Sequence, residues 1–258
     1  MSVSVEESVV LRLRAAGCVF AEDEARLLVE AARTPSDLTG LVDRRVAGVP
    51  LEHLLGWAEF GGLRVALTSG VFVPRRRTEF LVEQAVALGR PGAVVVDLCC
   101  GSGALGLAVA AAVGGLDLHA ADVDPAAVAC ARVNVARVGG SVHQGDLYAA
   151  LPAGLQGRVE VLLANVPYVP TEAIALMPPE ARLFEPRVAL DGGADGLDVA
   201  RRVTAAALEW LAPGGCLLFE TGEEQSTTAV GIATAAGLRA RVAADDERGA
   251  TVVLATRP

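Results

Sequence analysis

The sequence predicts an α/β fold with a seven-stranded, mostly parallel sheet, preceded by a small helical domain. Three observations support this prediction. Strand-like and helix-like segments alternate regularly from about residue 94 onward. The alternation starts with a strand, a glycine turn and a helix, which is the first half of a nucleotide-type binding unit. The last two strands follow each other without a helix between them, which indicates a terminal antiparallel hairpin.

Residues 1–50 are expected to form a small helical bundle. Val5–Ala16 and Glu22–Ala32 carry apolar residues at three- and four-residue spacing, and they are separated by a glycine. Asp37–Ala47 is expected to be a third helix, with Ser36 as its candidate N-cap. Because this bundle is too small to hold a nucleotide, we expect it to serve in packing or in substrate recruitment.

Residues 51–77 are expected to join the bundle to the second domain as a β-hairpin linker. The segment alternates apolar and polar residues in LRVAL and has a turn signal at Gly61-Gly62. The second domain then covers residues 78–258 and begins with a helix over Thr78–Leu88.

The elements of the second domain can be placed in order from their apolar patterns. The expected strands are Val94–Val96, Leu116–Ala121, Ser141–Gln144, Arg158–Ala164, Gly215–Glu220, Leu238–Ala243 and Ala250–Thr256. One helix is expected to begin near Ala104, and three more are expected over Pro125–Arg137, Gly196–Leu211 and Glu223–Ala236. Asp124 is a candidate cap for the helix that begins at Pro125. A long proline-containing loop reaches roughly Asp195.

The chain is organised around the stretch VVVDLCCGSGALGL, which begins at Val94. Its strand ends at Asp97, and Gly101 and Gly103 leave the following turn without side chains, so a ligand would lie against them at the helix N-terminus. Asp122 ends the next strand, about 20 residues after the glycines. This is the sequence separation at which an acidic residue binds the ribose diol of a nucleotide.

This layout serves both nicotinamide dinucleotides and S-adenosylmethionine, and two features favour the second. Asp97 lies directly before the turn, where a carboxylate can face the ammonium group of a methionine but would repel a pyrophosphate. The full GxGxxG pattern is also absent, because Gly106 comes one position late. A methyltransferase that uses S-adenosylmethionine is therefore the preferred interpretation.

A second motif, NVPY, consists of Asn165, Val166, Pro167 and Tyr168 and follows the strand Arg158–Ala164. The asparagine oxygen and the next backbone carbonyl can accept both hydrogens of a planar NH2 group, which would orient its nitrogen toward a methyl donor. The proline stiffens the turn, and the tyrosine offers a flat face to a planar substrate. In isolation the motif also fits a structural turn, but its place after a glycine turn and an acidic strand end favours catalysis.

Composition narrows the function classes. A net charge of −9 argues against a general polyanion-binding protein. Arg75, Arg76 and Arg77, together with Arg182 and Arg187, either line one basic rim or are scattered solvated arginines.

The sequence also indicates a cytoplasmic location. No apolar run approaches membrane-spanning length without glycine, proline or charge, and the N-terminus lacks a signal-peptide pattern. The five cysteines have no metal-ligand spacing, so we expect them to be small apolar residues in a reducing compartment and expect no metal site.

Seven segments between about residue 50 and the C-terminus share one resemblance. They are PLEHLLGWAEFGGL, FVPRRRTEFLVEQAV, DLCCGSGALGL, ADVDPAAV, LFEPRVALDGGADGLD, LLFETG and DDERGATVV. Together they resemble the HemK/PrmC-type protein-(glutamine-N5) methyltransferases, which modify peptide chain release factors. The resemblance implies a class I S-adenosylmethionine-dependent methyltransferase with a Rossmann-like sheet. The family's usual NPPY is NVPY here, which keeps the backbone carbonyl at the second position.

The resemblance also implies roles for individual residues. Asp122 would bind the ribose hydroxyls, Asp146 and Leu147 would border the adenine, and Asn165 would touch both cofactor and substrate. Val166 to Tyr168 would hold the substrate glutamine. The backbone along the cofactor would be that of Cys99, Cys100, Gly101, Ser102 and Gly103.

Two other functions remain open from the sequence. One is methylation of an exocyclic amine of adenine or another base, which presents the same NH2 geometry, although the net acidity and the lack of a basic recognition domain disfavour it. The other is a non-catalytic module that binds S-adenosylmethionine. The protein partner expected from the resemblance is a release factor, whereas membrane binding and direct nucleic-acid binding are not expected.

Overall fold

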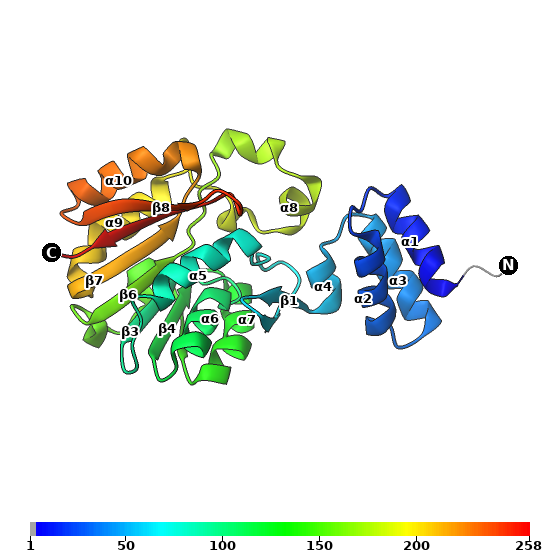
Figure 1. Ribbon diagram of the computed structural model, residues 1–258, viewed down its shortest axis with the longest axis horizontal. Helices are drawn as coiled ribbons and strands as arrows, with labels where there is room; N and C mark the ends of the chain where they lie inside the picture. Colours follow the sequence, from blue (N-terminus) through cyan, green and yellow to red (C-terminus); the bar gives the residue numbers. More distant parts are fainter. Residues whose placement is uncertain (1–3) are drawn as a thin grey trace.

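The computed structural model describes residues 4–258 and contains a seven-stranded sheet with helices on both faces (Figure 1). The strands are β1 (Trp57–Phe60), β2 (Leu63–Ala66), β3 (Val94–Leu98), β4 (Asp117–Asp122), β5 (Ser141–Gln144), β6 (Val159–Ala164), β7 (Leu211–Glu220), β8 (Arg239–Asp245) and β9 (Ala250–Thr256). The α-helices are α1 (Val5–Ala15), α2 (Ala21–Ala31), α3 (Pro35–Val46), α4 (Leu51–Leu55), α5 (Glu79–Val86), α6 (Ala104–Val113), α7 (Pro125–Val135), α8 (Pro179–Phe184), α9 (Asp198–Trp210) and α10 (Ser226–Ala235).

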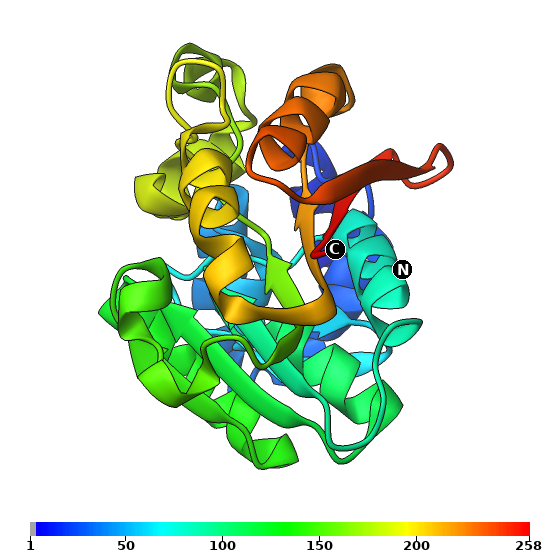
Figure 2. The same cartoon turned by 90° about the vertical axis from the view of Figure 1, so that its left-hand side faces the viewer.

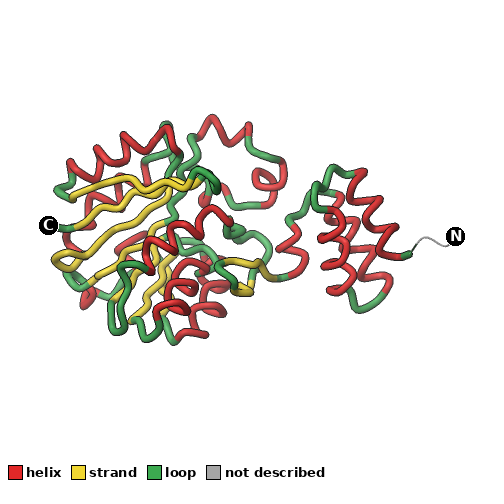
Figure 3. The backbone as a smooth tube through the Cα atoms, in the orientation of Figure 1, coloured by secondary structure: helices red, strands yellow, loops and turns green. Residues whose placement is uncertain are grey.

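The large sheet has the strand order β5-β4-β3-β6-β7-β9-β8, and its first five strands are parallel. β9 runs antiparallel between β7 and β8, so the predicted terminal hairpin is confirmed (Figure 3). All seven predicted strands are present. The largest difference is in β7, which begins at Leu211 rather than Gly215 because an irregular stretch with a proline and two glycines precedes its regular part.

Both faces of the sheet are buried, which explains why the central strand is a continuous apolar run. Val94 and Val96 pack in the core beneath α9 and α10, whereas Val95 packs in the core beneath α5, α6 and α7. Figure 2 shows α9 and α5 on opposite sides of the sheet. The parallel strands therefore all deliver their carboxyl ends to one edge, where ligands bind in open α/β sheets.

The N-terminal helices form a separate cluster at one end of the molecule (Figure 1). Leu13 and Leu28 are fully buried in its core. The predicted cap Ser36 is wrong: Thr34 caps α3, and its hydroxyl accepts the Asp37 N–H at 3.1 Å. The reason is that Pro35 occupies the first helical turn, which moves the capping position one residue before it. Residues 1–3 of the predicted bundle lie outside the described residues.

The predicted hairpin linker is shorter than expected. Only β1 and β2 form the hairpin, and the residues before it form α4, which places Leu51 and Leu54 against the core of the N-terminal cluster. After the hairpin, Val71 and Val73 pack against α7 of the second domain. The segment thus divides its contacts between the two parts of the chain, while the domain limits at residues 50 and 77 stay predictions.

Asn134 on α7 connects the hairpin to the glycine turn. Its side chain is fully buried, and its amide group donates to the carbonyl oxygens of Ala66 and Ser102, both at 2.8 Å. Its oxygen accepts the Ala66 N–H, also at 2.8 Å. The end of β2 is thereby held directly beside the turn that follows β3.

The long loop expected before α9 contains short helices. α8 and two 3-10 turns occupy much of the chain between β6 and α9. Val169 forms an isolated parallel bridge with Asp191, so the chain returns to the point at which it leaves β6. This return brings residues 190–196 beside the NVPY motif.

Candidate active site

A cavity of about 190 Å³ opens at the carboxyl ends of β3, β4 and β6. Ala164 pairs with Leu98 in the parallel sheet, which places the NVPY motif beside the glycine turn. Segments that lie far apart in sequence therefore meet in one pocket. The predicted site residues that line it are Cys99, Cys100, Gly101, Ser102, Asp122, Asp146, Leu147, Asn165, Val166, Pro167 and Tyr168.

Two predicted cofactor residues, Asp97 and Gly103, do not line the cavity. Asp97 is 1% exposed and turns inward, where its Oδ2 accepts the Gly106 N–H at 2.9 Å. Burial raises the pKa of Asp97 to about 7. Gly103 packs against α7, where a Cβ would lie 2.9 Å from the Val135 Cγ2 atom. Both residues contact neighbouring helices on the side of the turn away from the cavity.

The Asp122 carboxylate lies at the cavity and fixes the turn at the same time. Its Oδ2 accepts the Gly101 N–H at 2.8 Å, and its Oδ1 accepts the Asp124 N–H at 2.9 Å. Burial raises the pKa of Asp122, and these backbone hydrogen bonds partly offset that effect. Each carboxylate oxygen retains a second lone pair that can accept a ligand hydroxyl.

Cys99 has a backbone φ of +55°, a left-handed conformation that is unusual for a residue with a side chain. Burial raises the pKa of both Cys99 and Cys100, so the two thiols stay protonated at neutral pH. All five cysteines are free. Among residues 4–258 no group of three or more histidine, cysteine or acidic side chains could hold a metal ion. The thiols of the turn are therefore neither metal ligands nor nucleophiles.

One end of the cavity is bounded by an exposed ion pair that the sequence did not predict. Arg202 on α9 lines the cavity, and its Nη2 lies 2.5 Å from the Asp146 Oδ2. The adjacent Leu147 has a φ of +48° and also faces the cavity. No local motif marks Arg202, because its role depends on α9 returning to the end of β5.

Asn165 carries the most informative atom of the site. Its Oδ1 is buried and has no hydrogen-bond partner within residues 4–258. An amide oxygen buried without a partner is costly, so its position calls for an explanation, and a functional role is one. Since Asn165 lines the cavity, this oxygen is available to accept a hydrogen from a bound group.

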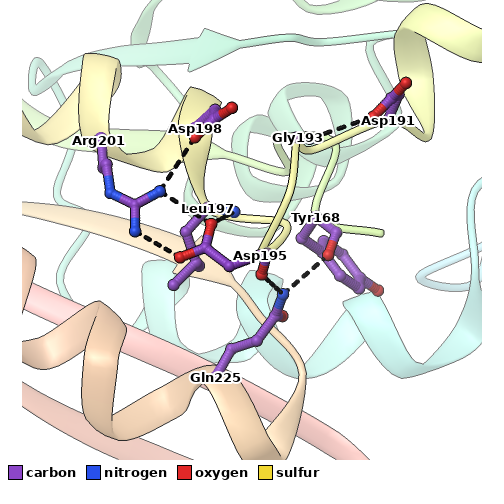
Figure 4. Close-up of polar contacts among 8 residues, drawn as sticks. All are labelled: Tyr168, Asp191, Gly193, Asp195, Leu197, Asp198, Arg201 and Gln225. Atoms are coloured by element: carbon purple, nitrogen blue, oxygen red, sulfur yellow. Dashed lines mark hydrogen bonds and ion pairs between the residues drawn. The ribbon is translucent and has the colours of Figure 1, made fainter. Parts of the chain in front are cut away.

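The other end of the NVPY motif is held from two directions. The Tyr168 hydroxyl donates to Glu220 and accepts from Arg77. The sequence indicated no role for Glu220 and placed Arg77 only in a possible basic rim. The Tyr168 carbonyl accepts from the Gln225 amide at 3.0 Å, and the same amide donates to the Asp195 carbonyl at 2.8 Å (Figure 4). The resembling segments LLFETG and LFEPRVALDGGADGLD contain Glu220 and Asp195, but resemblance alone gave neither residue a role.

Glycines allow the loop that carries Asp195 to lie directly against the motif. A Cβ on Gly192 would be 2.7 Å from the Pro167 carbonyl oxygen, and one on Gly196 would be 2.2 Å from that of Tyr168. Arg201 pairs with the Asp195 carboxylate and holds its pKa at about 2 (Figure 4). The loop thus covers the carbonyl groups of Pro167 and Tyr168.

The predicted arginine group is divided rather than gathered into one rim. Arg75 pairs with the buried Glu185 at 2.6 Å, and Arg75 and Arg77 line the cavity. Arg182 and Arg187 do not line it, and Arg187 pairs with an aspartate of its own loop.

No helix within the described chain is both long and apolar enough to cross a bilayer.

Substitution of Gly196 tests the close approach behind the motif. Gly196 and Gly214 have φ values of +77° and +78°, but only the Gly196 site is crowded. Both alanine variants carry the same backbone strain, so we expect Gly196→Ala to lower the free energy of unfolding by about 1–3 kcal/mol more than Gly214→Ala. Urea denaturation measures the difference, and equal losses would contradict the packing described.

Comparison with known proteins gives consistent results. A family model described as the methyltransferase small domain matches residues 63–178. The release factor glutamine methyltransferase of Geobacter sulfurreducens is 38% identical over 220 residues, covering 84% of this chain and 76% of that protein. The protein of the same name from Deinococcus radiodurans is 37% identical over 256 residues, covering 91% and 90%.

A solved structure agrees on the fold. The crystal structure of a methyltransferase from Pyrococcus furiosus aligns with a TM-score of 0.57 at 15% identity, covering 76% of this chain and 88% of that one. At this identity the likeness concerns the fold alone, and it confirms the predicted class I methyltransferase sheet. Because more than a third of the positions are identical to those relatives along most of both chains, the protein belongs to the family of release factor glutamine methyltransferases.

Proposed function

We propose that this protein transfers a methyl group from S-adenosylmethionine to the side-chain amide nitrogen of a glutamine in a peptide chain release factor. The observation that carries the proposal is the Asn165 Oδ1, a buried acceptor without a partner in residues 4–258 at the wall of the cavity. The relatives named above support the same reaction.

The residues of the cavity fit S-adenosylmethionine. The Asp122 carboxylate would accept the ribose hydroxyls, and Asp146 and Leu147 would border the adenine. Gly101 has a φ of +54° and no atom within 4 Å of the place of its Cβ, so the turn leaves room for a ligand along its backbone. When bound, S-adenosylmethionine supplies a methyl group attached to a positively charged sulfur.

The protein's contribution is to orient a weak nucleophile. An amide nitrogen is poorly nucleophilic because its lone pair is delocalised into the carbonyl group. The Asn165 Oδ1 and the Val166 carbonyl would accept its two hydrogens and fix the direction of the nitrogen. These contacts would strengthen as positive charge passes from sulfur to nitrogen, so they would stabilise the transition state more than the bound substrate. The methylated nitrogen then loses one of its two protons to water, and the sulfur is left as a neutral thioether.

Pro167 and Tyr168 would complete the substrate side of the site. Pro167 lacks an N–H and stiffens the turn. Tyr168 lines the cavity, where its ring would offer a flat face to a planar amide. We propose a cytoplasmic location, which the five free cysteines support, and neither membrane binding nor direct nucleic-acid binding.

The activity is tested by transfer of a labelled methyl group. Purified release factor, the same factor with its candidate glutamine replaced by alanine, and adenine-containing single- and double-stranded DNA are offered as acceptors. Label on one glutamine of the release factor, located by peptide mass spectrometry, is the expected result. Label on DNA alone would favour base methylation, and no transfer despite cofactor binding would favour a non-catalytic module.

Asp122→Ala is expected to weaken the binding of S-adenosylhomocysteine by about 1.5–3 kcal/mol, the range for a hydrogen bond to a charged group. Asp117→Ala, at the other end of β4, is the control and should bind normally. Protonation removes the carboxylate acceptor, and burial raises the pKa of Asp122. Binding to the unmodified protein should therefore weaken as pH falls, beginning at a higher pH than for an ordinary aspartate.

Calorimetry across a pH series measures both effects of Asp122. Unchanged affinity in folded Asp122→Ala would remove this carboxylate from the binding site. A pH profile that is the same with and without Asp122 would show that another group controls the titration.

Asn165→Ala is expected to lower kcat by roughly 10²–10³, as for loss of a preorganised electrostatic contact. Affinity for S-adenosylhomocysteine should change far less, because the turn and Asp122 supply the other cofactor contacts. Steady-state kinetics and calorimetry on the same preparations separate the two quantities. Normal turnover by Asn165→Ala would make the NVPY turn structural.

A further inference from the structure

The Tyr168 hydroxyl is held by two charged side chains that have no part in the proposed methyl transfer. It donates to the Glu220 Oε1 at 2.6 Å and accepts from the Arg77 Nη2 at 2.5 Å. The Arg77 Nε donates to the same carboxylate oxygen at 3.0 Å, which closes a ring of three contacts. Hydrogen bonds that involve a charged partner are shorter and stronger than those between neutral groups.

The sheet brings Glu220 to this position. Glu220 is the last residue of β7, and the pairing of Ala164 with Phe219 places it beside Asn165 at the carboxyl end of β6. Two neighbouring parallel strands thus deliver the NVPY motif and the carboxylate that binds its tyrosine. The arrangement follows from the register of the sheet and not from a flexible loop.

The Glu220 carboxylate accepts hydrogen bonds from the side chains of Tyr168 and Arg77. Its side chain is 3% exposed, and its Oε2 is buried without a partner in residues 4–258. A buried carboxylate loses its hydration, so each remaining hydrogen bond matters more than it would at the surface. Loss of the Tyr168 contact would leave the charge with Arg77 alone.

Tyr168 lies between the cavity and a buried carboxylate. Tyr168 and Arg77 line the cavity, whereas Glu220 does not. Burial raises the pKa of Tyr168, so its phenol keeps the proton that it donates to Glu220. The Arg77 guanidinium carbon lies 5.8 Å from the centre of the Tyr168 ring.

We propose that Glu220, together with Arg77, is a positioning residue that fixes the place of the Tyr168 ring beside the substrate amide. A tyrosine held only at its backbone can swing about its Cα–Cβ bond, whereas one whose hydroxyl oxygen is held by two partners keeps one direction of its long axis. Rotation about the Cβ–Cγ bond leaves this oxygen in place, so the two contacts fix where the ring lies. The inference rests on the proposed glutamine methylation for its effect on rate. Its structural part, the immobilisation of the ring, does not depend on which substrate is used.

The structural part is tested by nuclear magnetic resonance without any substrate. The chain has two tyrosines, so ring-13C tyrosine labelling gives two sets of signals, which Tyr168→Phe assigns. Tyr148 is the internal control, because its hydroxyl donates to the Val203 carbonyl at 2.8 Å, away from Glu220. Glu220→Met should shift the Tyr168 signals and increase the ring's mobility while leaving those of Tyr148 unchanged. Unchanged Tyr168 signals would overturn the proposal.

The effect on rate is tested with a double-mutant cycle. Glu220→Met should lower kcat about tenfold, as small misplacements at a reacting centre do, while KM and the affinity for S-adenosylhomocysteine stay within about twofold. Glu220→Gln keeps a neutral acceptor and should recover part of the loss. Combination of Glu220→Met with Tyr168→Phe should cost no more than Tyr168→Phe alone, because both remove the same contact.

A matched control separates positioning from folding. Glu160 on β6 pairs with Arg90 at 2.8 Å, and Glu160→Met should leave kcat unchanged. Additive losses in the double variant, or equal losses in kcat from Glu220→Met and Glu160→Met, would contradict the proposal. If the unmodified enzyme transfers no methyl group to a release factor, the proposed function fails while the resonance experiment still decides the role of Glu220.

Discussion

The site depends on one close approach, in which the Gly106 N–H donates to the buried Asp97 carboxylate at 2.9 Å. A Cβ on Gly106 would lie 3.1 Å from that oxygen and 3.1 Å from the Leu118 Cδ1 atom, so only glycine fits comfortably. This contact fixes the first turn of α6 against the end of β3. The residues between them form a tight turn in which Cys99 takes a left-handed conformation. Cys99 to Ser102 of that turn line the cavity.

The two halves of the site are built in different ways. The cofactor half comes from consecutive strands and turns, with Asp122 bound to the Gly101 N–H. The substrate half combines the NVPY motif with side chains from β7, from the following turn and from the loop before α9. Each contact of the second half crosses at least 50 residues of sequence or depends on a glycine that lets backbones meet. The cofactor half needs only to bind the methyl donor, whereas the substrate half must also point the amide nitrogen toward the methyl group.

The fold was largely predictable because its signals are local. Continuous apolar strands, the glycine turn and Asp124 as a cap each depend on a few neighbouring residues, and the structure confirms them. The errors arise where a local pattern fits two structures. Thr34 and Ser36 are both common cap residues, and the position of Pro35 decides between them. The pattern before the hairpin likewise did not distinguish α4 from a strand.

The site residues that directly follow a strand could be predicted from the sequence. Those that reach the site from distant segments of the chain could not. Asn165 and Asp122 follow strands whose carboxyl ends share one edge, so their convergence follows from the fold class. Arg202 and Gln225 lie within helical segments and reach the site only through tertiary packing. Asp97 was expected to face a ligand, but its position within a fully buried strand turns the carboxylate toward α6 instead.

The most direct test of the account is a crystal structure of the protein with S-adenosylhomocysteine and a release-factor domain that contains the candidate glutamine. The account predicts the glutamine amide nitrogen within hydrogen-bond distance of the Asn165 Oδ1, the ribose hydroxyls on Asp122, and the amide plane facing the Tyr168 ring. A glutamine bound elsewhere, with the Asn165 Oδ1 still without a partner, would contradict it.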